Sequence, residues 1–369
     1  MGQALPPPLL AQNTTIRGEE NADITSRAPL GFKVDTDPTE GYVTYVDQST
    51  ASSASLISTS NNTVYMGVDS TNVASGSGRK SVRITSKNSY DTGLVILDLE
   101  HMPGSICGTW PAFWMVGPDW PTTGEIDIIE GVNTQVGNAM TLHTGSECSI
   151  SDDVTMYGSI ETSDCYVYAS GQTENAGCGI TTSSSASYGD GFNAVDGGVY
   201  ATEITSEGIS IWNFDRSSIP SDISSGSPDP SGWGEATASF SGSCDFSSNF
   251  ESLQIVFDTT FCGTWAGTVW SSDSTGWGWG NGHPSRTHVN EGEFYAATTP
   301  TTLETAPAQK RDTATSAPEE DVVEDSSVVK AMAKEKRSIA DSQDGLSEKA
   351  HRHVLEHKRS HGIRRAWQA

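Results

Sequence analysis

Basic residues are scarce in this sequence of 369 residues. It has 21 lysines and arginines against 47 aspartates and glutamates, for a net charge of −26. Residues 310–369 carry 12 basic and 11 acidic side chains, so the excess of acid belongs to residues 1–309. Such an acidic body repels phosphate backbones, which excludes nucleic acid as a partner. The charge suits a soluble protein that acts on a neutral partner.

Long hydrophobic segments are also absent. No stretch of about 18 apolar residues occurs, which excludes a transmembrane helix, and the polar C-terminal end lacks the hydrophobic tail of a lipid-anchor signal. The opening MGQALPPPLLAQNTT has no apolar core of the kind found in signal peptides. The sequence therefore predicts a soluble chain with no membrane partner and no signal peptide as written.

Zinc-type cysteine spacing is a third absence. None of the six cysteines lies in a Cys-x-x-Cys pair, so disulfides are their expected use. The sequence does not choose among the many possible pairings. Disulfides in turn imply an oxidising compartment. Nothing in the sequence requires a metal or a cofactor.

Helical periodicity appears nowhere before about Val328. Short segments of alternating apolar and polar residues recur instead, among them YVTYV, SVRIT and GLVILDLE, with turn residues between them. This pattern predicts an all-β protein built as a sandwich of two antiparallel sheets.

Three carboxylates are crowded into the ten-residue segment GEIDIIEGVN. The apolar residues between them are β-branched, which predicts a strand. Alternation along a strand places Glu125 and Asp127 on one face and turns Glu130 to the other. A β-bulge at Ile128 or Ile129 would return Glu130 to the face of the other two, and bulges are frequent beside active sites.

Crowded carboxylates cannot all ionise cheaply, so at least one pKa is expected to rise and to leave a proton available near neutral pH. Paired carboxylates indicate glycosidic chemistry, in which one attacks the anomeric carbon and another protonates the leaving oxygen. The alternative is an acidic strand whose charges are solvated or bind a cation.

Tryptophans surround this segment. Trp110, Trp114 and Trp120 precede the first glutamate within GTWPAFWMVGPDWP. Flat indole faces stack on sugar rings, so tryptophans beside paired acids indicate a polysaccharide cleft. Core packing is the alternative: Trp110 and Trp114 share one strand face, and we expect at least one of them in the core. Trp120, in a turn rich in proline and glycine, is expected to be exposed and to contact ligand.

These motifs, with the following MTLHT, together resemble glycoside hydrolase family 16, and its fungal endo-1,3(4)-β-glucanases most. The Glu-x-Asp-x-x-Glu spacing is similar to the bulged laminarinase-type branch, whereas lichenases and cell-wall transglycosylases lack the extra residue. Further matches are YGDGFNAVDGGVYATE, SEGISIWNFDRSSIP and IVFDTTFCGTWAG, so the resemblance covers about residues 30–270. It implies a β-jelly roll with a concave substrate cleft.

Roles for single residues follow from the resemblance. It implies Glu125 as nucleophile, Glu130 as acid/base, and Asp127 as the residue that orients the nucleophile. His143, in MTLHT, matches an auxiliary histidine near the reacting centre, with a satisfied polar side chain as the alternative. Trp265, in FCGTWAG, matches a position that lines the cleft, with a buried core tryptophan as the alternative.

Both ends of the chain depart from the family pattern. The stretch from Ile16 to Pro29 is polar, and the STGWGWGNGHPSRTHVNEGEFYAATTP stretch after WAGTVW resembles nothing in the family. We therefore expect terminal strands to be missing, as after errors in the gene model. The expected organisation is an atypical segment 1–29, a catalytic domain 30–297, and a disordered low-complexity tail 298–369 with a short basic helix from Val328 to Ile339.

The resemblance implies a retaining endo-β-glucanase that cuts internal β-1,3 or mixed β-1,3/1,4 linkages of β-glucan polysaccharides. It further implies a monomer without a cofactor, located outside the cell or in the cell wall. A structural calcium ion on the convex face, as in relatives, stays open. Two alternatives remain: a transglycosylase, in which a sugar acceptor replaces water, and a non-catalytic glucan-binding module.

Overall fold

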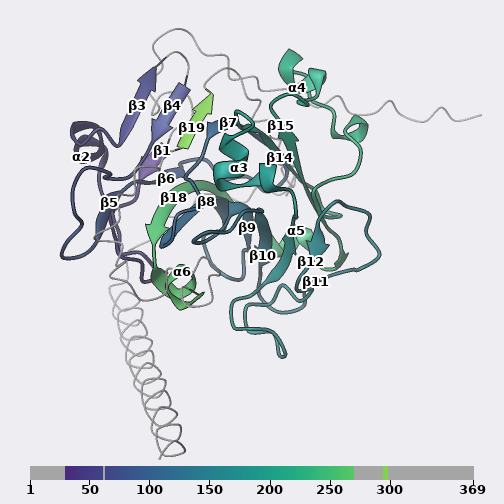
Figure 1. Cartoon of the computed structure of the whole chain (residues 1–369). Coiled ribbons are helices and arrows are strands. Elements are labelled where there is room, and N and C mark those ends of the chain that lie inside the picture. The colour runs from purple at the N-terminus through teal and green to yellow at the C-terminus, as the bar shows by residue number, and fades with distance from the viewer. Residues whose placement is uncertain (1–29, 61–62, 270–293, 298–369) are drawn as a thin grey trace, which may run out of the picture. The chain divides into compact units, whose positions relative to one another are not determined.

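Two antiparallel sheets face each other in the computed structural model (Figure 1). The structure describes residues 30–60, 63–269 and 294–297, the last with main chain alone, and all of these belong to the unit of residues 1–309. The expected atypical segment 1–29, the tail 298–369 and its basic helix lie outside the described residues. Every strand pairing within the two large sheets is antiparallel, which confirms the predicted all-β sandwich.

The larger sheet carries the acidic segment near its middle. In order across the sheet, its eight strands are β1 (Leu30–Phe32), β6 (Arg83–Ser86), β18 (Gln254–Phe261), β8 (Thr109–Val116), β9 (Glu125–Glu130), β10 (Ala139–His143), β13 (Cys178–Thr181) and β12 (Ser159–Ile160). The catalytic candidates therefore lie on β9 and β10, two consecutive strands of the chain that pair with each other.

The second sheet has seven strands in the order β16 (Ala238–Phe240), β15 (Ile209–Asp215), β14 (Gly198–Ile204), β7 (Gly93–His101), β19 (Phe294–Ala297), β4 (Thr63–Met66) and β3 (Ile57–Ser60). Two small pairs complete the strands: β11 (Ser149–Ile150) with β17 (Gly242–Ser243), and the parallel pair β2 (Val43–Tyr45) and β5 (Arg79–Ser81).

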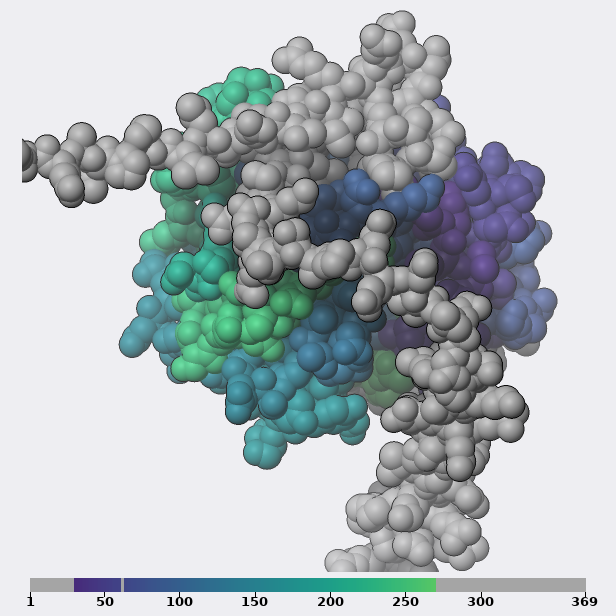
Figure 2. Space-filling model, turned by 180° about the vertical axis from the view of Figure 1, so that it is seen from behind, coloured from purple at the N-terminus to yellow at the C-terminus, as the bar shows by residue number. Residues whose placement is uncertain are grey.

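Helices are short and lie in the connections. They are α2 (Gln48–Ser53), α3 (Gly189–Asn193), α4 (Ser221–Ser225), α5 (Phe246–Asn249), α6 (Gly263–Val269) and the 3-10 turns η1 (Ser185–Ser187) and η2 (Pro230–Gly232). None of the helices in the described ranges is long and apolar enough to cross a membrane. Viewed from behind, the purple residues from the start of the described chain lie on the right flank and teal residues from its middle lie on the left (Figure 2).

The strand between β7 and β4 corrects the expectation of a missing element near the end of the domain. Residues Phe294–Ala297 form β19, which pairs with both neighbours and closes the gap between them. This strand was not expected from the sequence because it has only four residues, and so short a strand gives little hydrophobic pattern.

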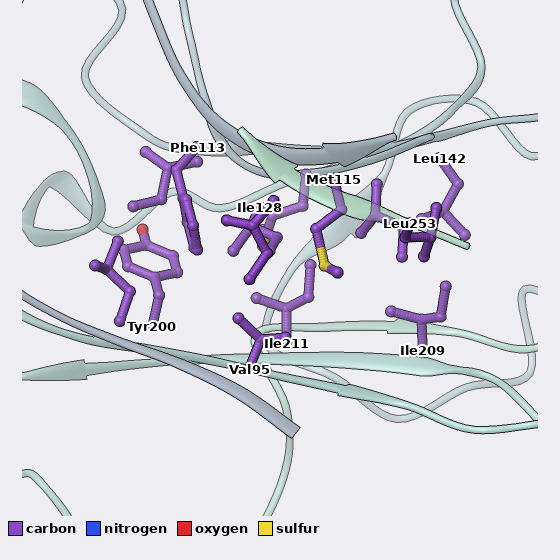
Figure 3. Close-up of a cluster of buried hydrophobic side chains, with 14 of the residues drawn as sticks. Val95, Phe113, Met115, Ile128, Leu142, Tyr200, Ile209, Ile211 and Leu253 are labelled. Atoms are coloured by element: carbon purple, nitrogen blue, oxygen red, sulfur yellow. The ribbon is translucent and has the colours of Figure 1, made fainter. Parts of the chain in front are cut away.

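The core lies between the two large sheets. In Figure 3, side chains such as Phe113 and Met115 from β8 point toward Val95, Tyr200 and Ile211 from the opposite sheet. Alternation along β8 explains this arrangement, because these two residues are buried in the core while their neighbours face the other way. One face of the larger sheet is therefore committed to packing, and the other is free to form a binding surface.

The connection from β8 to β9 ends at Gly124, directly before the acidic strand. Gly124 has a positive φ of 78°, and a Cβ atom there would lie 2.3 Å from the Asn249 carbonyl oxygen and 2.5 Å from the Phe250 ring. Only glycine fits this position. The same connection carries Trp120, whose side chain is 42% exposed, as the sequence predicted for it.

Four of the six cysteines form disulfides. Cys148 bonds to Cys244. Cys165 bonds to Cys178 and closes the loop that leads into β13. The expectation that the cysteines serve as disulfides is confirmed for these four residues.

Candidate active site

Strand β9 contains the bulge that the spacing of its acids predicts. On the β8 side, Trp114 pairs with Asp127 and Phe113 pairs with Ile129, so Ile128 is the additional residue. The pairing with β10 shows the same irregularity. The bulge restores Glu130 to the face that carries the other two acids, because it compensates for the odd spacing.

The carboxyl groups are poorly hydrated. Asp127 is 2% exposed, and Glu125 and Glu130 are half-buried. Burial, followed by the neighbouring Asp127 carboxylate, raises the pKa of Glu125 and of Glu130 to about 8. Burial and the charge of Asp258 raise the pKa of Asp127 to about 8. The site therefore retains protons at neutral pH.

Specific contacts distinguish the three acids. The Trp110 indole Nε1 donates a hydrogen bond of 2.8 Å to Glu130 Oε1. Glu125 and Asp127 lie close enough for each to shift the pKa of the other, Asp127 raising that of Glu125 and Glu125 lowering that of Asp127. His143 Nε2 lies 3.3 Å from Asp127 Oδ2, and His143 pairs with Glu125 across β9 and β10. The histidine predicted to be auxiliary is thus beside the acids.

A cleft of about 370 Å³ opens above these groups, a size typical of ligand sites. Its wall includes all three acids and also Trp110, Trp114 and Trp120. Since both Trp110 and Trp114 line the cleft and are half-buried, neither is the core residue that we expected one of them to be.

Trp265 lies behind this wall. It belongs to α6, is half-buried, and packs edge-on against Trp110 with ring centroids 5.5 Å apart. The cleft lining includes the preceding Thr264 but not Trp265 itself. Trp265 therefore supports the indole that bonds Glu130.

A second charged group lines the cleft, and the sequence analysis missed it. Arg83 from β6 lies 3.5 Å from Asp258 of β18 and stacks over the Trp114 ring at 4.9 Å from its centroid. Burial raises the pKa of Asp258 to about 6, although Arg83 opposes the shift. These residues lie far from the acidic motif in sequence, so only the strand pairing brings them to it.

Asn138 is the other residue that sequence reasoning missed. It is fully buried just before β10 and hydrogen-bonds the main chain of the bulge, accepting from Glu130 N and donating to the Ile128 carbonyl oxygen. In sequence it follows Gly137 and is typical of a turn.

Glu125, Asp127 and His143 also have potential metal ligands within 4.8 Å of one another. The donor set is hard carboxylate oxygen with one imidazole, and His143 Nε2 lies 3.3 Å from Asp127 Oδ2.

Comparison with known proteins agrees with this geometry. The family model of XgeA-like catalytic GH16 domains matches residues 31–298. The chain belongs to glycoside hydrolase family 16. The family match reaches beyond residue 270 and includes β19, so the prediction that the later stretch is foreign to the family is wrong.

Relatives and solved structures extend the family assignment. An endo-1,3(4)-β-glucanase of Arthroderma benhamiae is 50% identical over 239 residues, which are 64% of this chain and 52% of that enzyme. Laminarinase 16A from Phanerochaete chrysosporium has a TM-score of 0.67 and 40% identity, over 73% of this chain and 92% of that chain. An elongating GH16 β-1,3-glucosyltransferase has the same TM-score with 44% identity, over 73% and 93%. This chain thus spans about half the length of the Arthroderma glucanase.

Proposed function

We propose that this chain is a retaining endo-β-glucanase acting on β-1,3 or mixed β-1,3/1,4 glucans. The observation that carries the proposal is the bulged strand β9, which directs Glu125, Asp127 and Glu130 into one tryptophan-lined cleft. The printed names of the relatives support this substrate class. A glucan is uncharged, so the net charge of −26 on the chain does not repel it from the cleft.

The proposed reaction is a double displacement. A Glu125 carboxylate oxygen bonds to the anomeric carbon as the glycosidic C–O bond breaks, and the Glu130 carboxyl gives its proton to the leaving oxygen. Glu130, now ionised, then takes a proton from water, whose oxygen displaces Glu125 from the sugar. Of these two neighbouring acids, Asp127 is assigned the proton, because the nucleophile must be ionised.

The contacts support this division of roles. The hydrogen bond from Trp120 and the nearby His143 favour the ionised form of Glu125 and lower its pKa against the effect of burial. The Trp110 indole fixes the Glu130 carboxyl by donating a hydrogen bond to its Oε1 atom. His143 is proposed as an auxiliary residue that fixes Asp127.

The transglycosylase alternative has one specific observation in its favour, the structural similarity to an elongating β-1,3-glucosyltransferase. The two reactions share the first step and differ in whether water or a sugar hydroxyl attacks the intermediate. Hydrolysis gives only products shorter than the substrate, whereas transfer also gives products that are longer than it.

The proposal also covers the location of the protein, the bounds of its catalytic domain and its oligomeric state. The two disulfides support a secreted enzyme in the cell wall or outside the cell. Residues 30–297 are proposed as the catalytic domain, acting as a monomer.

The test compares the full chain with Glu125→Gln. Reducing ends released from laminarin and from mixed-linkage β-glucan are measured, and circular dichroism establishes that both proteins are folded. We expect release by the wild type and a loss of about 10⁴-fold in the variant. If neither folded protein cuts but both are retained on a glucan gel, the chain is a binding module and the proposal fails.

A further inference from the structure

Asn138 occupies an unusual place for a polar side chain. It is fully buried between the bulge of β9 and the connection that carries η1. A buried side-chain amide must find hydrogen-bond partners, or its burial costs free energy. The partners it finds belong to the residues that the chemistry depends on.

The amide replaces the strand pairing that the bulge removes. A bulge leaves main-chain groups of its strand without a ladder partner. Asn138 Oδ1 accepts from Glu130 N at 2.9 Å, and Asn138 Nδ2 donates to the Ile128 carbonyl oxygen at 2.7 Å. Both sides of the bulge are therefore held by one side chain.

Further contacts fix Asn138 itself. Its main-chain N donates to Ser187 Oγ at 2.9 Å, and its carbonyl accepts from Thr182 N at 3.2 Å. The Tyr200 hydroxyl donates to the Ser187 carbonyl from β14 of the opposite sheet. Figure 3 shows Tyr200 reaching from that sheet toward the layer of Ile128. The bulge is thus tied across the core to both sheets.

We propose that Asn138 is a positioning residue: its side-chain amide fixes the bulge and thereby aims the Glu130 carboxyl at the leaving glycosidic oxygen. This inference rests on the proposed function, in which Glu130 is the general acid. Asn138 is not part of the cleft lining, so it acts through the main chain of Glu130 and touches no substrate. A shift of the carboxyl by a fraction of an ångström would weaken proton transfer.

A misaimed acid has a selective consequence. A sugar leaving group is a poor one and needs its oxygen protonated as the bond breaks. A 2,4-dinitrophenolate leaves without a proton, so its release does not depend on Glu130. An altered Glu130 position must therefore slow cleavage of glucan much more than cleavage of an aryl glycoside, whereas a loss of folded enzyme slows both equally.

The test measures kcat/KM of the full chain on laminarin and on 2,4-dinitrophenyl β-laminaribioside. Asn138→Leu keeps the shape of the side chain and removes both of its hydrogen bonds. We expect kcat/KM on laminarin to fall about 100-fold and that on the aryl glycoside to change by less than about threefold. Equal losses on the two substrates would show a purely structural role and overturn the proposal.

Asn193→Leu is the matched control. The Asn193 amide makes the same pair of main-chain bonds, accepting from Met102 N at 3.0 Å and donating to the Met102 carbonyl at 2.9 Å, away from the acidic strand. We expect this variant to lower thermal stability yet to change both substrates by the same factor. A laminarin-selective loss in this control would also count against the proposal, because the selectivity would not be specific to the bulge.

Two additional variants keep the outcome decisive. If Asn138→Leu does not fold, it is replaced by Asn138→Ser, which retains one polar atom. The quantity compared is again the ratio of kcat/KM on laminarin to kcat/KM on the aryl glycoside. A ratio equal to that of the wild type overturns the proposal. Glu130→Ala is measured in parallel. If Glu130→Ala shows no leaving-group dependence, the proposed acid role fails; if it does and folded Asn138→Leu does not, the failure belongs to Asn138 alone.

Discussion

Trp110 joins the wall of the cleft to the general acid. Its indole donates to Glu130 Oε1, and this bond stabilises the ionised carboxylate and so lowers the pKa of Glu130. In Trp110→Phe the bond is lost, and the pKa of Glu130 should rise. Because the acid acts in its protonated form, the alkaline limb of kcat/KM on laminarin should move up by about half a pH unit.

Trp212→Phe is the control for this experiment. Trp212 Nε1 donates to the Gly234 carbonyl at 3.2 Å on the outer face of the other sheet, so its loss should leave the pH profile unchanged. An alkaline limb that stays in place in Trp110→Phe would mean that the indole bond does not govern the proton of Glu130.

Single residues differ in how far the sequence could predict them. Glu125, Asp127 and Glu130 lie in one short segment, so their spacing alone indicated a shared face. Arg83 and Asp258 could not be found in this way, because each belongs to a strand that meets the acids only through sheet pairing. Asn138 resembled a turn residue, and only its two bonds to the bulge distinguish it.

At the scale of elements, the bulge was predictable because strand parity is a simple rule, whereas the end of the cleft was not. The loop from Cys165 to Cys178 places Asn175 in the cleft lining. The same loop packs tightly against His143, since a Cβ atom on Gly177 would lie 2.9 Å from His143 Nδ1. Neither the disulfide pairing nor this contact has a signature in the sequence.

The disulfide that closes this loop should affect substrate binding more than chemistry. The double variant Cys165→Ser, Cys178→Ser releases a loop with a sequence separation of 13, at a cost of about 3 kcal/mol in the free energy of unfolding. We expect KM for laminarin to rise about fivefold as Asn175 loses its position, while kcat changes by less than about twofold.

Removing the other disulfide provides the contrast. Cys148 and Cys244 are separated by 96 residues, and neither residue lines the cleft, so Cys148→Ser, Cys244→Ser should cost about 4 to 5 kcal/mol and leave KM unchanged. Urea unfolding and steady-state kinetics measure the two quantities. If KM rises in both double variants in proportion to the loss in free energy of unfolding, the loop has no specific role in binding.

At the scale of the whole molecule, the active site opposes stability. The chain carries a net charge of −26, and three of its carboxyl groups lie side by side in the active site, where burial raises the pKa of each to about 8. Asp127 and Glu130 hold their protons in the folded protein at pH values where the unfolded chain has released them. The folded state therefore binds more protons than the unfolded state between about pH 4 and pH 8.

This difference fixes the direction of the pH dependence. The free energy of unfolding should fall as the pH rises through that window, by about 1.4 kcal/mol per pH unit for each extra proton held in the folded state. Glu130→Gln removes one titrating group without changing its size, so its slope between pH 5 and pH 7 should be shallower by up to that amount. Ile223→Val, a neutral change in the outer core, should lower stability without altering the slope. Urea unfolding at a series of pH values measures all three proteins, and parallel lines for wild type and Glu130→Gln would show that Glu130 does not hold its proton in the folded enzyme.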